Sequence, residues 1–268
     1  MAVVTHRDRD DLYDEAFEDV HTFSGTPYPC TQDELDVSGG VNRQEPISTL
    51  TIFEALRRNG PIEEHLYPGL RDLWFDHRNL GPFISARTAA REVHDHNNLS
   101  RGPPGAERQA IDRLDVAIDD AYTHKWGPDL IIKAFCDLDT VFFRGRLRGH
   151  VCVAWKPDHL MGQSKYGVTG YLGHGKCTIN LNAAEILRYQ SSSKAFEKMW
   201  STMLHEMCHA YAQVRVREHE WRDDERLHGK NFGTKIHAVA RRADYLFGLF
   251  VDINQFGSDV PFPRYDSP

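Results

Sequence analysis

The feature that most constrains this chain is the stretch from His205 to His209, which reads His-Glu-Met-Cys-His and matches the pattern H-E-x-x-H. Residues four positions apart lie on one face of a helix, so both imidazoles could bind one metal ion. Glu206 follows the first histidine and could reach a water molecule on that metal. Two nitrogen ligands, an open coordination position and a carboxylate base are what a zinc peptidase requires.

The pattern is short, and its surroundings make it more specific. With 15 His among 268 residues, H-E-x-x-H can arise by chance. The flanking residues are mostly apolar and include no Gly or Pro, which is typical of a buried helix beginning near Ala195. Buried histidines and a buried carboxylate are costly unless something satisfies them. A metal site therefore explains these residues better than a purely structural helix.

Composition is that of an ordinary globular protein, with 40% hydrophobic and 26% charged residues. No apolar run approaches the length of a membrane span, so we expect no membrane partner. The charged segment from Met1 to Asp19 lacks the apolar core of a signal peptide, so we expect an intracellular protein. The five Cys form no C-x-x-C pair, which argues against a zinc ribbon and a disulfide framework and fits a reducing compartment.

The net charge of −7 is unevenly distributed along the chain. Residues 1–104 carry 10 Arg and 18 acidic residues, a net charge of −8, and the remaining residues sum to +1. Net charge therefore gives no reason to expect nucleic-acid binding. The sequence still allows a local basic and aromatic patch, formed by Arg144, Arg146, Arg148, Lys156 and Trp155. It could contact single strands, or it could be a solvated edge beside a core tryptophan, which the charge balance favours.

Periodicity and turn residues predict an α+β fold. Helical spacing and capping residues predict helices over 48–58, 83–94, 106–126, 129–143, 183–189, from about 195, and over 228–246. Alternating apolar residues predict strands over 151–155, 167–172 and 176–182. Gly173-His174-Gly175 predicts a hairpin turn between the last two strands. The densely charged stretch 214–227 is typical of a solvated loop or a helix end.

The sequence leaves several candidates for a third metal ligand, since catalytic zinc usually takes three protein ligands and a water. The metzincin spacing is excluded, because Ala212 and Arg215 occupy the positions where it needs Gly and His. The remaining candidates are His228, Glu218, His219, Glu220 and Glu225. His228 is favoured because it opens a new helix after a loop long enough to fold back, and Gly229 lets the backbone approach closely.

Five motifs occur in a characteristic order: FFRGRL (142–147), VCVAW (151–155), GVTGYLGHGKCTINLN (167–182), LHEMCHAY (204–211) and HGKNF (228–232). This order resembles the SprT-like metallopeptidase family, and most of all protease domains of the Spartan type. The resemblance covers about residues 110–250 and is more specific than H-E-x-x-H alone. Two departures are a longer and more charged segment between the second and third histidines, and no Cys-rich zinc ribbon after the domain.

The resemblance implies a fold, a cofactor and a site. It implies a zincin-like helical domain packed on a small antiparallel sheet. It implies Zn²⁺ held by His205, His209 and His228, with Glu206 as the catalytic base. It also implies an endopeptidase that cleaves proteins bound or crosslinked to DNA, with single-stranded or damaged DNA as a further partner and a nuclear location.

The predicted organisation has three segments. Residues 1–104 form an acidic N-terminal extension that is helical or irregular and of unknown function, with its 45–97 region packed on the rest. Residues 105–252 form the SprT-like metallopeptidase domain, and 253–268 form a C-terminal tail. The Gly- and Pro-rich stretch 101–105 marks the first boundary.

Other functions stay open on the residues alone. One is a nucleic-acid-binding module with a structural or vestigial zinc site. Another is a zinc peptidase acting on proteins that are not on DNA, with the acidic N-terminal region as an adaptor or a cover. Tyr171 and Tyr211 are either donors to the oxyanion or ordinary core residues.

Overall fold

The computed structural model describes residues 82–251, except 124–129, 149, 157–160, 162–164, 174, 183–184, 187–188, 190–191 and 227. The helix predicted over 48–58, most of that predicted over 183–189, and the segments 1–81 and 253–268 lie outside the described residues. The elements in chain order are α4 (Ala86–His96), α5 (Gly105–Thr123), α6 (Leu130–Phe143), β1 (Val151–Lys156), β2 (Gly167–Gly173), β3 (Lys176–Asn182), α9 (Ser192–Arg215), α10 (Glu218–Arg226) and α11 (Lys230–Phe247).

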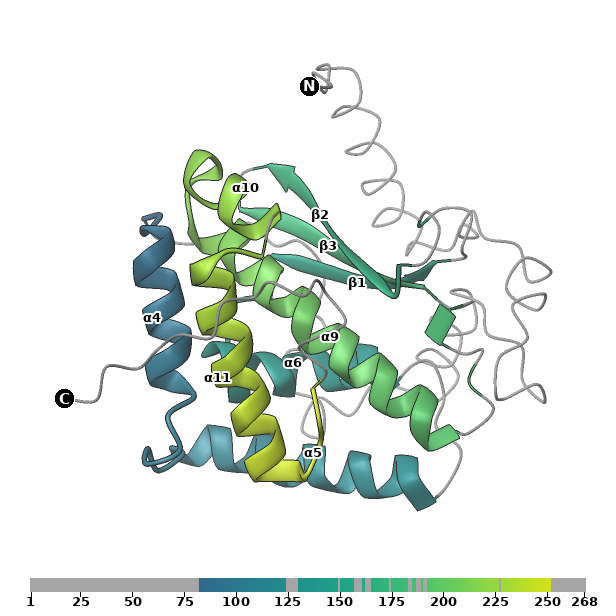
Figure 1. The fold of residues 1–268 in the computed structure, drawn as a ribbon. Coiled ribbons are helices and arrows are strands. Elements are labelled where there is room, and N and C mark those ends of the chain that lie inside the picture. Colours follow the sequence, from purple (N-terminus) through teal and green to yellow (C-terminus); the bar gives the residue numbers. More distant parts are fainter. Residues whose placement is uncertain are drawn as a thin grey trace.

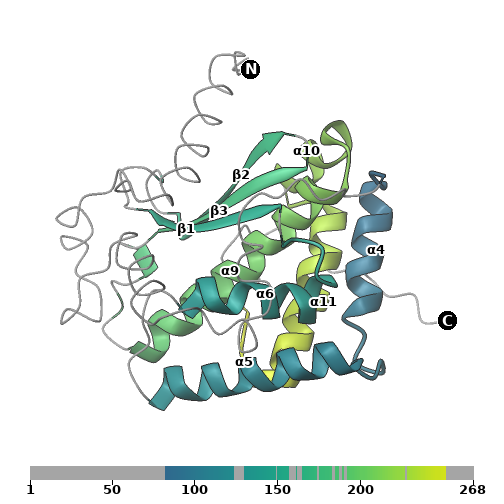
Figure 2. The same cartoon turned by 180° about the vertical axis from the view of Figure 1, so that it is seen from behind.

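Helix α9 runs through the middle of the molecule (Figure 1). It contacts β2 and β3 on one side and α5 and α6 on the other, and it also touches α4, α10 and α11. The reverse view shows α5 and α6 below the sheet, with α9 between the sheet and these two helices (Figure 2). This central position follows from the sequence of α9. Its apolar residues occur on nearly every side of the helix, and they can be buried only if the helix lies between layers.

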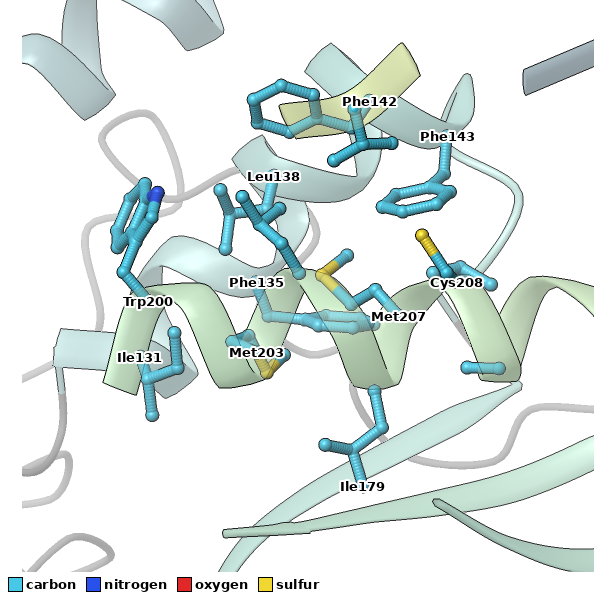
Figure 3. Packing of buried hydrophobic residues seen from close by; sticks show 14 of the residues in the cluster. Ile131, Phe135, Leu138, Phe142, Phe143, Ile179, Trp200, Met203, Met207 and Cys208 are labelled. Atoms are coloured by element: carbon cyan, nitrogen blue, oxygen red, sulfur yellow. The ribbon is translucent and has the colours of Figure 1, made fainter. Parts of the chain in front are cut away.

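The core lies between α6, α9 and the sheet. Figure 3 shows Phe135 and Leu138 of α6 packed above Met203 and Met207 of α9, with Ile179 of β3 on the opposite side of that helix. All five side chains have 0% exposure. Because α9 is covered on both sides, its polar residues must find partners within the protein or at a bound group.

The sheet is mixed rather than wholly antiparallel. Its order is β1-β3-β2, with β2 and β3 antiparallel and β1 parallel to β3. The predicted hairpin between β2 and β3 is confirmed, and Gly173 and Gly175 adopt the positive φ angles of 94° and 71° that favour glycine. The α+β class and the small sheet with an antiparallel pair are confirmed, and the sheet differs from the expectation in that β1 runs parallel to β3. That strand pairs with β3 instead of its sequence neighbour β2, so β3 lies between them.

The N-terminal helix α4 is part of the folded body. It packs against α11 along its length and also contacts α6 and α9. The Ile84 amide donates to Arg215 O at 2.9 Å, and Ile84 forms a parallel bridge with Val216 at the end of α9. For this helix, the expected packing of the 45–97 region is confirmed. The segment boundary at 104/105 stays a prediction.

The other predicted helices are confirmed with small shifts at their ends. The charged stretch 214–227 contains helix α10, on which Trp221 is only 8% exposed. One aromatic side chain thus packs this helix onto the domain, so the segment is more than a solvated loop. Within the part of the chain that the structure covers, no helix has the length and apolar character of a membrane span.

Candidate metal centre

Three histidines from two parts of the chain converge at one point. His205 and His209 lie one turn apart on α9, and His228 lies directly before α11. Their ligand atoms all lie within 4.8 Å of one another, and this is the cluster among the described residues that could hold a metal ion. Of the candidates for a third ligand, the structure therefore brings His228 to the pair.

The distances between the imidazole nitrogens fit a tetrahedral ion. His209 Nε2 lies 3.1 Å from His205 Nε2 and 3.2 Å from His228 Nε2. Nitrogens at about 2.0–2.1 Å from a tetrahedral zinc lie about 3.3 Å from one another. Two of the three nitrogen pairs thus have the spacing expected around a tetrahedral zinc ion, and three protein ligands would leave the fourth position for a water molecule or a substrate.

His228 reaches the site through an unusual backbone conformation. Its φ angle is 50°, in the left-handed region that few residues other than glycine adopt, although histidine is enriched there. The chain then enters α11 through Gly229, which has an extended conformation at the helix N-cap. A strained backbone that delivers a side chain to a cluster is typical of functional sites.

Phe232 supports all three imidazoles. Its fully buried ring is stacked on His209, with centroids 4.3 Å apart, and lies 4.9 Å from His205 and 4.6 Å from His228. Phe232 is the last residue of the motif HGKNF noted in the sequence. Because this one ring contacts all three imidazoles from the first turn of α11, it can fix the orientation of every histidine in the cluster.

Burial keeps the first histidine neutral. The ring of His205 is 2% exposed, and burial, together with the nearby His209 and His228, lowers its pKa well below the usual value. A neutral imidazole is the form that binds a metal ion. Lys235 of α11 donates from Nζ to Cys208 O at 2.8 Å, which ties the start of that helix to α9 between the two histidines.

Glu206 lies beside the cluster and faces the sheet. It is 5% exposed, and burial raises the pKa of its carboxyl, while the charge on His209 and a hydrogen bond from Thr169 oppose that shift. The Thr169 hydroxyl donates to Glu206 Oε2 at 2.7 Å. A buried carboxylate next to a metal site is arranged as a general base would be.

The other candidate ligands are engaged elsewhere or exposed. Glu220 accepts a hydrogen bond from the Ala86 amide at the start of α4, and Glu218 pairs with Arg222. The His219 side chain is 74% exposed on α10. The side chain of Glu225 lies outside the described residues.

The two tyrosines differ in their surroundings. Tyr211 has 0% exposure, and its hydroxyl donates to Glu92 Oε2 of α4 at 2.7 Å, away from the histidines. Burial and that carboxylate raise its pKa above the ordinary range. Tyr211 is therefore a core residue that links two helices. Tyr171 of β2 packs edge-on against Trp221 of α10, with ring centroids 5.2 Å apart.

Of the two interpretations of the basic residues near β1, the structure favours the one with a core tryptophan. Trp155 has 0% exposure, because alternation along β1 turns it into the core, where no base could stack on it. Arg148 donates to Cys136 O at 2.9 Å and lies 3.6 Å from the buried carboxylate of Asp139, so it holds the turn after α6. Arg144 is exposed on the surface. The side chain of Lys156 is not described.

Comparison with known proteins identifies the region that contains this site. Residues 131–252 match the SprT-like family. The matched range holds the three histidines and Glu206, and it confirms the resemblance carried by the five motifs. Over these residues the chain is similar to the SprT-like family, which suggests a metallopeptidase-type domain. The searches of curated proteins and of solved structures returned no match.

Sequence reasoning missed two residues that surround Glu206. Thr169 donates the hydrogen bond described above, and Gly167 lies where β2 comes closest to α9. Both lie in the predicted strand 167–172 on alternate positions, which place them on the same face. The sequence showed the alternation along this strand, but it did not show that α9 faces these two residues.

Proposed function

We propose that this chain is a zinc-dependent endopeptidase of the SprT-like type. The observation that carries the proposal is the convergence of His205, His209 and His228, whose ligand atoms lie within 4.8 Å of one another, beside the buried carboxylate of Glu206. A three-histidine set with an open fourth position is typical of catalytic zinc. The match of residues 131–252 to a peptidase family supports the same reading.

In the proposed mechanism the three histidines would hold Zn²⁺, which supplies a water of lowered pKa and polarises the scissile carbonyl. Glu206 would accept a proton from the attacking water and then deliver it to the leaving amine, the general acid–base role of a carboxylate close to the reacting atoms. Phe232 would hold the imidazoles in their orientation. Because the Tyr211 hydroxyl is engaged by Glu92, it takes no part in this chemistry.

We further propose that the substrates are proteins bound or crosslinked to DNA, with single-stranded or damaged DNA as a second partner and a nuclear location. This proposal rests on the resemblance to SprT-like proteases of the Spartan type. The alternatives are a zinc peptidase acting on proteins away from DNA and a nucleic-acid-binding module with a vestigial site. The burial of Trp155 and the internal contacts of Arg148 argue against the binding module, because they take the aromatic ring and one arginine out of the surface it would use.

The test uses the zinc-loaded protein and its Glu206→Gln variant, with a histone as substrate, with and without single-stranded DNA. The proposal predicts cleavage by the parent alone and faster cleavage when DNA is present. Cleavage that is indifferent to DNA would support a general zinc peptidase. No cleavage under any condition, with zinc still bound, would support the binding module, and undiminished cleavage by Glu206→Gln would contradict the mechanism.

A further inference from the structure

The edge strand of the sheet contacts the proposed base directly. Strand β2 is at one end of the order β1-β3-β2, and its residues at 167 and 169 face α9. Thr169 Oγ1 lies 2.7 Å from Glu206 Oε2 and 3.1 Å from Glu206 O. A hydroxyl has one proton to donate. Oε2 is both the nearer oxygen and the charged one, so it is the stronger acceptor. The hydrogen bond therefore goes to the carboxylate.

The close approach of strand and helix requires a glycine two residues earlier. A Cβ atom on Gly167 would lie 2.6 Å from Thr202 Cγ2, 2.9 Å from Glu206 Cγ and 3.0 Å from Glu206 Oε1. These separations are shorter than a carbon–carbon contact allows. Gly167 thus makes room for the Glu206 side chain, and Thr169 then meets its carboxylate.

Together the two residues restrict where the carboxylate can lie. A glutamate has three side-chain torsions and loses considerable rotamer freedom when fixed, so a base that must act in one geometry benefits from being held in advance. The hydroxyl engages Oε2, and the Thr169 backbone also forms a hydrogen bond with this carboxylate, so one residue of β2 holds the group in place. No other side-chain donor to Glu206 is recorded among the residues that the structure covers.

We propose that Thr169 is a positioning residue, which orients the Glu206 carboxylate for proton transfer through its hydroxyl. This inference rests on the proposed peptidase function. Thr169 does not touch the histidines or a bound peptide in this account, and it acts only through Glu206.

The first test compares Thr169→Val, which removes the hydroxyl at nearly equal volume, with Thr169→Ser, which keeps it. Thr169→Val should lower kcat by about 10- to 100-fold, the usual cost of losing a residue that orients a group at a metal site, with KM and zinc content unchanged. Thr169→Ser should stay within about threefold of the parent, because it keeps the donor. The matched control is Thr178→Val on β3, which pairs with Gly170 and lies on the opposite face of the sheet.

Three results would overturn the proposal: an unchanged kcat in Thr169→Val, equal losses in the valine and serine variants, or a loss confined to KM. Equal losses would mean that packing at this position matters and the hydroxyl does not.

A second test needs no catalysis, so it separates this inference from the proposed function. In the metal-free protein, urea unfolding is measured for the parent, Thr169→Val, Glu206→Ala and the double variant. The stability that Thr169→Val loses in the parent should largely disappear in the Glu206→Ala background, since the partner is gone. Additive losses would refute the coupling. If the parent cleaves nothing, the peptidase proposal fails, and this cycle still decides whether Thr169 orients Glu206.

Discussion

The two sides of helix α9 are held by different kinds of contact. Toward β2 and the start of α11, the helix presents His205, Glu206 and His209 to a few directional partners, among them Thr169 and Phe232. Toward α6 it presents mostly apolar side chains that pack against one another (Figure 3). The comparison shows that one face of a helix can serve the site while the other face stabilises the fold. Substitutions on the site side should change metal binding and activity, and those on the core side should change the free energy of unfolding.

The largest expected effect is on the site side. His228→Ala should abolish cleavage and weaken zinc binding by more than about 100-fold, because it removes a ligand rather than a residue that supports one. The stability of the metal-free protein should change little. Zinc affinity is measured by competition with a chelator. His219→Ala is the matched control, since that side chain is 74% exposed on α10. Full zinc affinity in His228→Ala would show that His228 is not a ligand and would contradict the assignment of metal binding to this side of α9.

The next effect belongs to the core side. Phe135→Ala should lower the free energy of unfolding by about 3–5 kcal/mol, since it leaves a cavity between α6 and α9. Urea unfolding measures this loss, and Val116→Ala, at a position 62% exposed on α5, should stay within about 0.5 kcal/mol of the parent. Zinc content under native conditions should be unchanged. A Phe135→Ala protein that keeps its stability but loses zinc would show that the two sides are not separate.

Tyr211 sharpens the comparison because it lies on the site helix but points to the core side. Tyr211→Phe should cost about 1–2 kcal/mol of unfolding free energy through the lost hydrogen bond to Glu92, with kcat unchanged. Tyr245→Phe, at a position 67% exposed, is the control. A collapse of kcat without a loss of stability would instead assign the hydroxyl to catalysis.

The smallest effect concerns pH at the far end of α4. Burial, with the charges of Arg101 and Arg242, lowers the pKa of His96 from 6.5 to about 4. The unfolded chain binds this proton below about pH 6.5 and the folded chain only below about pH 4, so stability falls as the pH falls through this window. The His96 contribution should be on the order of 1 kcal/mol, given its partial exposure.

The measurement compares urea unfolding at pH 7 and pH 4.5 for the parent and His96→Gln. The variant should lose less stability on acidification, while His205, whose pKa is also lowered, contributes equally to both proteins. His219→Gln should behave as the parent. Identical acid sensitivity in the parent and His96→Gln would remove His96 from the account.

Elements with strong local patterns could be predicted from the sequence. The alternation in 176–182 and the turn glycines predicted β3 and the hairpin, and the 3.6-residue spacing predicted α5, α6, α9 and α11. The H-E-x-x-H spacing predicted His205 and His209 as a pair, because ligand spacing on a helix is a local property. His228 was favoured by its place before a new helix and implied by the family resemblance.

What the sequence could not predict depends on contacts between distant segments. Nothing local in 151–156 indicates whether β1 pairs with β2 or β3. The contact of Thr169 with Glu206 joins residues 37 positions apart. The bridge between Ile84 and Val216 joins residues that are still farther apart in the sequence, and it attaches the segment before α4 to the end of α9.

The measurement that most directly tests the central claim is X-ray absorption at the zinc edge on the purified protein, with zinc content measured in parallel. The account predicts one zinc ion per chain, with three imidazole nitrogens and one oxygen at about 2.0–2.1 Å, and the loss of one nitrogen or of the metal in His228→Ala. A sulfur ligand at about 2.3 Å, or a protein that retains no zinc, would contradict the three-histidine site.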